Sequence, residues 1–158
     1  IDPILVLQKL KKEGFELKLI MFGDGSQRKK LKNYCFKNGI DNHVIFAGNV
    51  DQITLSKIIP YASLVLSPHT GRALVEVGLG RVPVVAYDID WQSELIIHEE
   101  TGELVPYRDL EKFFSSAKKI LNKNSYSKLL STNLRRLCIN LFDPNKTIEE
   151  EVKIYENL

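Results

Sequence analysis

Residues 63–87 read SLVLSPHTGRALVEVGLGRVPVVAY: a strand-like run, a polar loop, a short helical segment and a second strand-like run. The second run, 82–87, is apolar and rich in β-branched residues, which is typical of an interior strand in a parallel sheet. Pro83 is compatible with this strand because it lies near its first residue. Two parallel strands joined by a helix are the building unit of an α/β sheet, so this stretch predicts that fold class.

The same alternation of segments extends along the chain in both directions. Asp2, Ser26 and Asp51 each precede a helical segment and are expected to cap it through their side-chain oxygens. Pro60 is expected to end or kink the helix that follows Asp51. We therefore predict an α/β domain with a doubly wound parallel sheet. The expected strands are 17–22, 44–47, 64–66, 82–87 and 104–105, and the expected helices are 2–14, 26–39, 51–60, 72–79, 110–121, 125–138 and 143–158.

Length, charge balance, apolar runs and cysteine spacing exclude several classes of protein. The chain has 158 residues, of which 44% are hydrophobic, and this suits one compact domain with a core of its own. Its 22 Lys and Arg nearly balance its 20 Asp and Glu, so we expect no nucleic-acid partner. The longest apolar runs fall far short of the roughly 20 residues that a membrane-spanning helix needs. Cys35 and Cys138 are too far apart for a redox or zinc motif, which predicts reduced thiols and a cytoplasmic protein.

The residues that directly follow each expected strand are the candidates for a site, because ligands of open parallel sheets bind outside the carboxyl ends of the strands. The most specific segment is 70–73, Thr-Gly-Arg-Ala, which leads from a loop into a helix. Free N–H groups at a helix start, a glycine and an arginine together favour a phosphate group. An ordinary turn with a solvent-facing Arg72 explains the same pattern, and both interpretations stay open.

Glu76 lies one turn into that helix, among apolar residues. An unpaired carboxylate is costly to bury, so Glu76 needs a partner. A nucleotide ribose offers two hydroxyl donors at about the right distance from a phosphate at the helix start. A salt bridge to a nearby Lys or Arg, or an exposed position, is the alternative.

Five segments taken in series carry a family resemblance, although no single one is decisive. They are 17–25, 43–48, 67–86, Glu94 and 101–105. In this order they resemble the C-terminal, donor-binding domain of retaining glycosyltransferases of family 4, which have the GT-B fold. The resemblance covers nearly the whole chain and implies a Rossmann-like half of that fold.

The resemblance also implies a function. It implies transfer of a hexose from a nucleoside diphosphate sugar to a hydroxyl of a glycan or lipid-linked acceptor, with no cofactor and no metal. It implies that Glu76 binds the donor ribose and that the loop at 71–74 meets the diphosphate and sugar. The turn at 48–50 would lie against the base, with the turn at 23–25 nearby. The implied donor-binding residues are Gly23, Gly25, Gly48, Asn49, Val50, Thr70, Gly71, Ala73, Leu74 and Glu76.

One departure from the family concerns catalysis. The family carries two glutamates eight positions apart, and the first of these positions is Pro68 here. Either His69, Arg72 or Asp90 performs the missing carboxylate's task, or catalysis is impaired. Three further interpretations stay open: a nucleotide-sugar binding module, a GT-B-like UDP-N-acetylglucosamine 2-epimerase, and a flavodoxin-like interaction domain.

A second departure concerns the start of the chain. The family domain opens with a strand and a basic loop, whereas this chain starts in what would be the first crossover helix. The absent strand would leave the strands at 17–22 and 64–66 without their shared neighbour. We therefore expect residues 1–158 to be the donor domain of a longer, two-domain polypeptide that also has an N-terminal acceptor domain, inactive when isolated.

Several other residues are expected to lie at the surface or to pack in the core rather than to bind a ligand. The basic stretch Arg28-Lys29-Lys30 with Lys32 is typical of the solvated face of an amphipathic helix, and approach to an anionic membrane is the alternative. His43 and His98 are expected at the surface, and Trp91 is expected to pack rather than to stack on a ligand.

Overall fold

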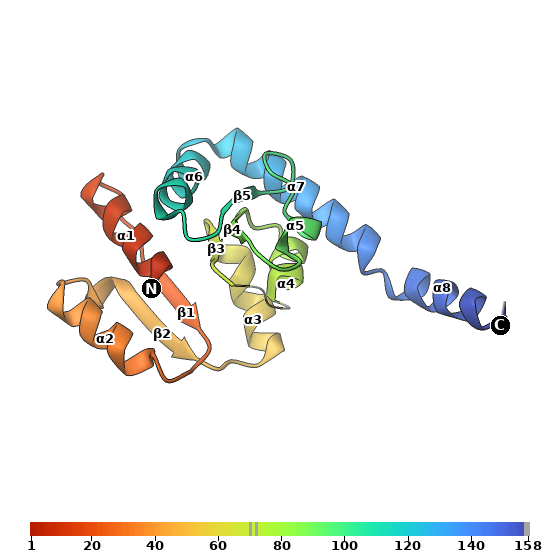
Figure 1. Cartoon of the computed structure of the whole chain (residues 1–158), viewed down its shortest axis with the longest axis horizontal. Coiled ribbons are helices and arrows are strands. Elements are labelled where there is room, and N and C mark those ends of the chain that lie inside the picture. The colour runs from red at the N-terminus through yellow and green to blue at the C-terminus, as the bar shows by residue number, and fades with distance from the viewer. Residues whose placement is uncertain (70, 72, 157–158) are drawn as a thin grey trace.

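A computed structural model describes the backbone of residues 1–69, 71 and 73–156 (Figure 1). Strands and helices alternate as the sequence predicts. The strands are β1 (Leu19–Phe22), β2 (Val44–Gly48), β3 (Val65–Ser67), β4 (Val84–Asp88) and β5 (Glu103–Pro106). The helices are α1 (Asp2–Lys12), α2 (Arg28–Lys37), α3 (Gln52–Ile58), α4 (Ala73–Leu79), α5 (Gln92–Leu95), α6 (Leu110–Asn122), α7 (Asn124–Leu141) and α8 (Pro144–Glu156), with short 3-10 turns η1 (Asp41–His43) and η2 (Ile59–Tyr61).

The strands form two separate parallel sheets. One has the order β1-β2, with Leu19 opposite Val44, and the other has the order β3-β4-β5, with Val65 opposite Val84. Among the described residues no ladder joins β1 to β3. This confirms the expectation that these two strands lack a shared neighbour.

Strand β4 carries the main core because both of its faces are covered. Val84 and Ala86 point into a cluster with residues of α4, α5 and α7. Val85 and Tyr87 point to the opposite side, into a cluster with α1 and α6. These four side chains are at most 1% exposed, which confirms the predicted interior strand and the doubly wound α/β class.

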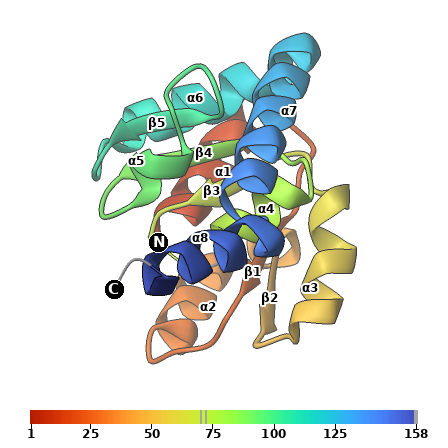
Figure 2. The same ribbon diagram turned by 90° about the vertical axis from the view of Figure 1, so that its right-hand side faces the viewer.

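Helix α1 connects the two sheets. Val6 and Leu10 pack with the β4 and α6 cluster, whereas Ile4 and Leu7 pack with Val44 of β2 and with α2. Figures 1 and 2 both show α1 between the β1-β2 sheet and α6. One amphipathic helix therefore supplies a buried surface to both halves of the molecule.

The three predicted helix caps have different outcomes. Asp51 caps α3, with its Oδ1 accepting from the Thr54 N–H at 2.8 Å, and Pro60 lies in η2 directly after that helix. The prediction for Asp2 is wrong, because its carboxylate accepts from the Tyr87 hydroxyl at 2.9 Å and the N-cap is Ile1. The prediction for Ser26 is also wrong, because α2 starts one residue later and Gln27 is its N-cap.

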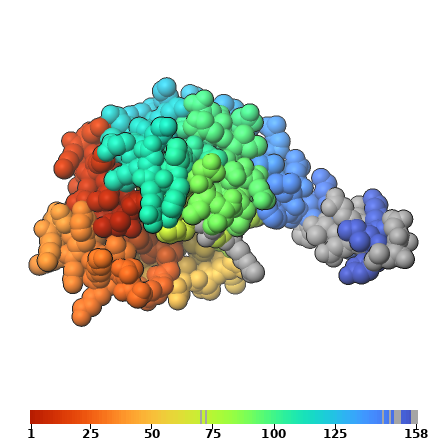
Figure 3. Space-filling model, viewed as in Figure 1, coloured from red at the N-terminus to blue at the C-terminus, as the bar shows by residue number. Residues whose placement is uncertain are grey.

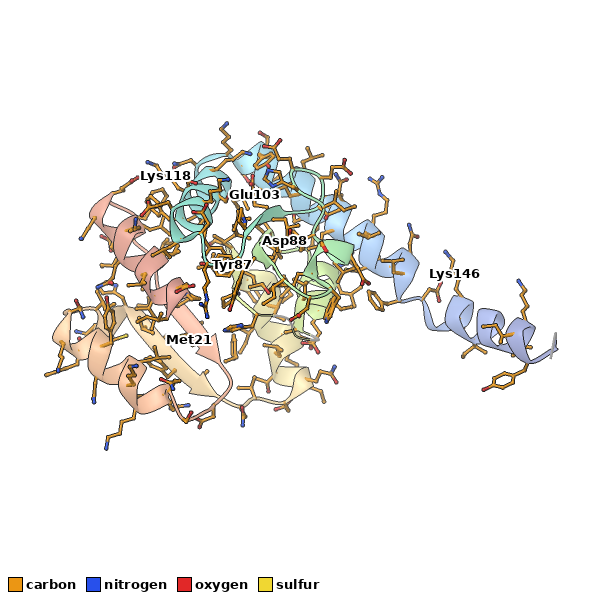
Figure 4. The ribbon with its side chains drawn as sticks, viewed as in Figure 1. Met21, Tyr87, Asp88, Glu103, Lys118 and Lys146 are labelled. Carbon is orange, nitrogen blue, oxygen red and sulfur yellow. The ribbon has the colours of Figure 1, made fainter. Side chains whose placement is uncertain are left out.

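A buried polar cluster around Glu103 ties β5 to α6 and α7. Its carboxylate accepts from Ser116 Oγ (3.0 Å), Tyr126 Oη (2.5 Å) and Lys119 Nζ (2.8 Å). Figure 4 labels Glu103 and also Tyr87, on the neighbouring strand. Burial and the hydrogen bond to Glu103 raise the pKa of Tyr126 to about 12.

Cys35 and Cys138 are unpaired and buried, as expected for reduced thiols. Burial raises the pKa of both thiols. In the part of the chain that the structure describes, no helix combines the length and apolar character needed to cross a lipid bilayer.

Candidate functional site

Two of the predicted site turns meet directly at the carboxyl ends of β1 and β2. The Gly23 N–H donates to the Gly48 carbonyl at 2.8 Å. Both residues have left-handed backbone conformations, with φ of 98° and 75°, which glycine adopts without strain. The backbone path itself therefore favours glycine at positions 23 and 48.

Arg28, on the first turn of α2, holds these two turns together. Its Nη2 donates to the Phe46 carbonyl of β2 at 2.9 Å, and its Nη1 lies 3.4 Å from the Asp24 carboxylate. A Cβ added at Gly48 would lie 3.3 Å from the same guanidinium. Sequence reasoning missed this contact because it interpreted the basic stretch as a solvated face, although Asp24 and Arg28 have the i, i+4 spacing of an ion pair.

The turn after β2 leads straight into the capped start of α3. Hydrogen bonds from the Thr54 backbone N–H and from the Thr54 hydroxyl lower the pKa of Asp51. The next residue, Gln52, donates from Nε2 to Glu76 Oε1 on α4, at 2.8 Å. This bond links the turn at 48–50 to the predicted ribose-binding carboxylate.

Glu76 has one satisfied and one unsatisfied carboxylate oxygen. Oε1 accepts from Gln52, whereas Oε2 is buried and has no hydrogen-bond partner among the described residues. None of the ion pairs within the described part of the chain involves Glu76. An unsatisfied buried acceptor costs about 1–3 kcal/mol, so this oxygen is suited to a hydroxyl donor brought by a ligand.

The loop after β3 is held by a buried amide that sequence reasoning missed. Gln92, at the start of α5, is fully buried, and its Nε2 donates to the Tyr87 carbonyl at 3.0 Å. Its Oε1 lies 2.5 Å from Ser67 Oγ, which also lies 3.1 Å from the His69 carbonyl. The amide thus joins the loop at 67–69 to the end of β4, and nothing in the local sequence singles it out.

The residues expected to meet the diphosphate lie partly outside the described residues, which exclude Thr70 and Arg72. Gly71 and Ala73 are exposed, at the start of α4. The Leu74 side chain belongs to the core, and its N–H donates to the Gly71 carbonyl at 3.1 Å. Leu74 therefore has no free N–H for a ligand in this conformation.

The segment after β4 carries exposed acids. Asp88 and Asp90 are exposed, and Asp90 has a left-handed φ of 50°. Figure 4 labels Asp88 beside Tyr87 at this end of β4. Trp91 is half-buried and packs against the core, as expected, while His69 is exposed on the neighbouring loop. Among the described residues, no group of His, Cys, Asp or Glu has the arrangement of a metal site.

A surface hollow lies away from these residues. It has a volume of about 690 Å³ and is lined by Ala62, Ser63 and Pro83, which precede β3 and β4, together with Arg81 and residues of α6 and α7. It is therefore at the amino ends of the strands, away from Glu76 and the turns described above.

Comparison with known proteins identifies a family and two relatives. A family model described as "Glycosyl transferases group 1" matches residues 3–137. An uncharacterized glycosyltransferase of Methanocaldococcus jannaschii is 24% identical over 148 residues, which are 91% of this chain and 38% of that protein. An exopolysaccharide phosphotransferase of Streptomyces coelicolor is 34% identical over 110 residues, 66% of this chain and 12% of that protein. The chain thus spans well under half of the length of these relatives.

Solved structures share the fold over nearly the whole chain. Staphylococcus aureus TarM, in complex with fondaparinux, alpha-GlcNAc-glycerol and UDP, matches 98% of this chain and 32% of its own, with a TM-score of 0.87 and 19% identity. Anabaena HepE in complex with UDP matches 90% of this chain and 41% of its own, with a TM-score of 0.81 and 21% identity.

Proposed function

The chain belongs to the group 1 glycosyl transferase family, and from this premise we propose that it is the donor-binding domain of a retaining enzyme. The enzyme would transfer a hexose from a nucleoside diphosphate sugar to a hydroxyl of a glycan or lipid-linked acceptor. No cofactor enters the proposal, because the sugar nucleotide is a substrate.

One observation carries this proposal: Oε2 of Glu76 is buried and has no hydrogen-bond partner among the residues that the structure describes. A carboxylate accepts two hydroxyl hydrogen bonds, and Gln52 occupies only one of its oxygens. The ribose diol of a sugar nucleotide supplies donors of this kind. The UDP complexes of TarM and HepE, which share the fold, support the choice of ligand.

The proposed chemistry needs stabilisation of a leaving diphosphate beside an oxocarbenium-like centre. Backbone N–H groups at Gly71 and Ala73 would meet that diphosphate, with Arg72 as the cation. His69 and Asp90, on adjoining loops, would serve on the sugar side, where the family's first glutamate is replaced by Pro68. The turns at Gly23, Gly25, Gly48, Asn49 and Val50 would line the base.

We also propose that the domain works within a longer polypeptide that contains an acceptor domain. Two observations support this: the relatives are much longer than the matched region, and β1 and β3 are not paired to each other in the described sheets. A further strand between them would complete one continuous sheet. A natural gene that encodes only these 158 residues would contradict the proposal.

A second candidate, a catalytically impaired nucleotide-sugar binding module, is favoured by Pro68 itself. It predicts that Pro68→Glu in the full-length polypeptide gives no gain in sugar transfer, while Glu76→Ala abolishes nucleotide binding. A gain of transfer in Pro68→Glu, measured by mass spectrometry of the products, would rule it out.

We further propose a cytoplasmic enzyme that associates with anionic membranes through α2. This helix contains Arg28, Lys29, Lys30, Lys32 and Lys37 and no acidic residue. Phe36, which is 75% exposed, lies one helical turn from Lys32 and two turns from Lys29. Basic side chains around an exposed aromatic ring suit an anionic lipid surface. Phe36→Ser should reduce co-sedimentation with phosphatidylglycerol vesicles but not with phosphatidylcholine vesicles, and unchanged co-sedimentation would contradict the role of α2.

The central test is calorimetric titration with UDP, GDP and ADP. One of these should bind, and Glu76→Gln should weaken its binding by roughly tenfold to a hundredfold, because charged hydrogen bonds to the sugar are lost. Glu100→Gln, an exposed loop change, is the control and should bind as the parent does. Absence of heat for every nucleotide at millimolar concentration would refute the proposal.

A further inference from the structure

The hydrogen bond between Gln52 and Glu76 joins two parts of the site that are 24 residues apart in sequence. Gln52 is the first residue of α3, directly after the Asp51 cap and the turn at 48–50. Glu76 lies on α4, beyond the loop that follows β3. The bond therefore couples the side chain proposed to hold the ribose to the turn proposed to hold the base.

The bond also fixes the orientation of the carboxylate. A glutamate has three rotatable side-chain bonds, so an unrestrained carboxylate has several rotamers available to it. With Oε1 held by Gln52 at 2.8 Å, Oε2 is directed to the buried position where no described residue meets it. A ligand hydroxyl then meets an acceptor that is already oriented, and less side-chain freedom is lost on binding.

The group that donates to Glu76 is a neutral amide, so the carboxylate keeps its full negative charge. A lysine or arginine would pair its charge with Glu76 and weaken the carboxylate as an acceptor for a sugar hydroxyl. The Gln52 amide donates without neutralising the negative charge. Its own position is set by the α3 cap, in which both Asp51 oxygens accept hydrogen bonds of 2.8 Å from Thr54.

We propose that Gln52 is a positioning residue: its amide orients Glu76 so that the carboxylate selects a ribose over a 2′-deoxyribose in the donor nucleotide. The inference rests on the proposed function, because it requires that Glu76 receive the ribose. The sequence alone does not indicate this role for Gln52, because a glutamine at the start of a helix is ordinary. In the structure the Gln52 residue is exposed.

The test compares two ligands on two variants. The nucleoside diphosphate that binds best among UDP, GDP and ADP is titrated alongside its 2′-deoxy form. Gln52→Leu should weaken binding of the ribonucleotide by roughly three- to tenfold and leave the deoxy form nearly unchanged, so that the preference for ribose shrinks. Gln8→Leu removes a comparable side-chain hydrogen bond, from the Tyr34 hydroxyl (3.0 Å), and should leave the preference intact.

A second variant gives a pH signature that loss of folding alone would not produce. In Gln52→Glu two carboxylates face each other, which raises the pKa of one of them. At pH 8 the repulsion should displace Glu76 and weaken ribonucleotide binding, whereas at pH 5 a shared proton should restore part of it. The parent chain should show no such recovery on acidification.

The outcomes separate the two proposals. If the parent binds no nucleotide, the proposed function fails and the role of Gln52 fails with it. If the parent prefers the ribonucleotide and Gln52→Leu keeps the full preference, only the positioning role is wrong. Equal weakening of both ligands by Gln52→Leu, or the absence of a pH effect in Gln52→Glu, would also overturn it.

Discussion

The β3-β4-β5 sheet, which forms the larger part of the molecule, is more deeply buried than the β1-β2 sheet of the smaller part. Val84, Val85 and Ala86 of β4 are completely buried, between helices on both faces. In the smaller sheet Ile20 is 42% exposed and Ile45 is 45% exposed, because α1 and α2 cover one face only. Figure 3 shows the red and orange residues of this smaller part gathered beside the green and cyan residues of the larger one.

This difference matters because the candidate site draws on both parts. Glu76 and the loop at 67–69 belong to the well-buried part, whereas the turn at 48–50 belongs to the exposed one. Gln52, on the helix that follows this turn, bonds Glu76 across the two parts. A ligand that contacts both parts would stabilise their relative position, since anything that binds only the folded state raises its stability.

The largest loss of stability is expected for a substitution in the core around the β3-β4-β5 sheet. Phe113 is completely buried and stacks on Tyr87 with ring centroids 4.3 Å apart. Phe113→Ala should lower the free energy of unfolding by about 3–5 kcal/mol through lost burial and a cavity. Ile45→Ala, in the exposed sheet, should change it by about 1 kcal/mol or less, as measured by urea unfolding. Similar losses in both variants would show that the two parts are equally packed.

An intermediate loss of stability is expected where the turns that follow β1 and β2 meet. Gly48→Ala places a side chain at a φ of 75° and sets its Cβ 3.3 Å from Arg28 Nη1. The strain should cost about 1–2 kcal/mol of stability in urea unfolding. Gly25→Ala is the control, because nothing lies within 4 Å of its added Cβ. If Gly48→Ala unfolds at the same urea concentration as the parent, the left-handed turn is not a constraint.

The smallest effect is a pH dependence of the α3 cap. The hydrogen bonds from Thr54 lower the folded-state pKa of Asp51, so its stabilisation is complete above the unfolded pKa of about 3.9. It is lost as the pH falls through the lower, folded value. Asp51→Asn keeps a capping oxygen without the charge, so its thermal unfolding temperature should fall less steeply than the parent's below about pH 4. Parallel curves would contradict this assignment.

The sequence predicted correctly those elements that depend on residues close together in the chain. Strand β4 is apolar up to its last residue, Asp88, and its observed ends lie within two residues of the predicted ones. Asp51 caps α3, the helix that starts at the next residue, as predicted. Asp2 fails as a cap because Tyr87, 85 residues away, takes its carboxylate. Propensity acts within a few residues, whereas tertiary packing decides which partner a polar side chain finally meets.

The same limit applies to the site. Glu76 was predicted because a carboxylate inside an apolar helix conflicts with its neighbours, and this conflict is visible in the sequence. Gln52, Gln92 and Arg28 were missed because polar residues near helix starts are ordinary. Their roles arise only when contacts with residues 18 to 25 positions away bring separate loops together.

The two buried thiols report separately on the two parts of the molecule. Cys35 packs with α1 and β2, and Cys138 packs with β4 and α4. A buried thiol reacts with an alkylating reagent only after its surroundings open, so each labelling rate measures local opening of one part. Cys35 should be alkylated first in the free protein, and a bound nucleotide that spans both parts should bring the two rates closer together.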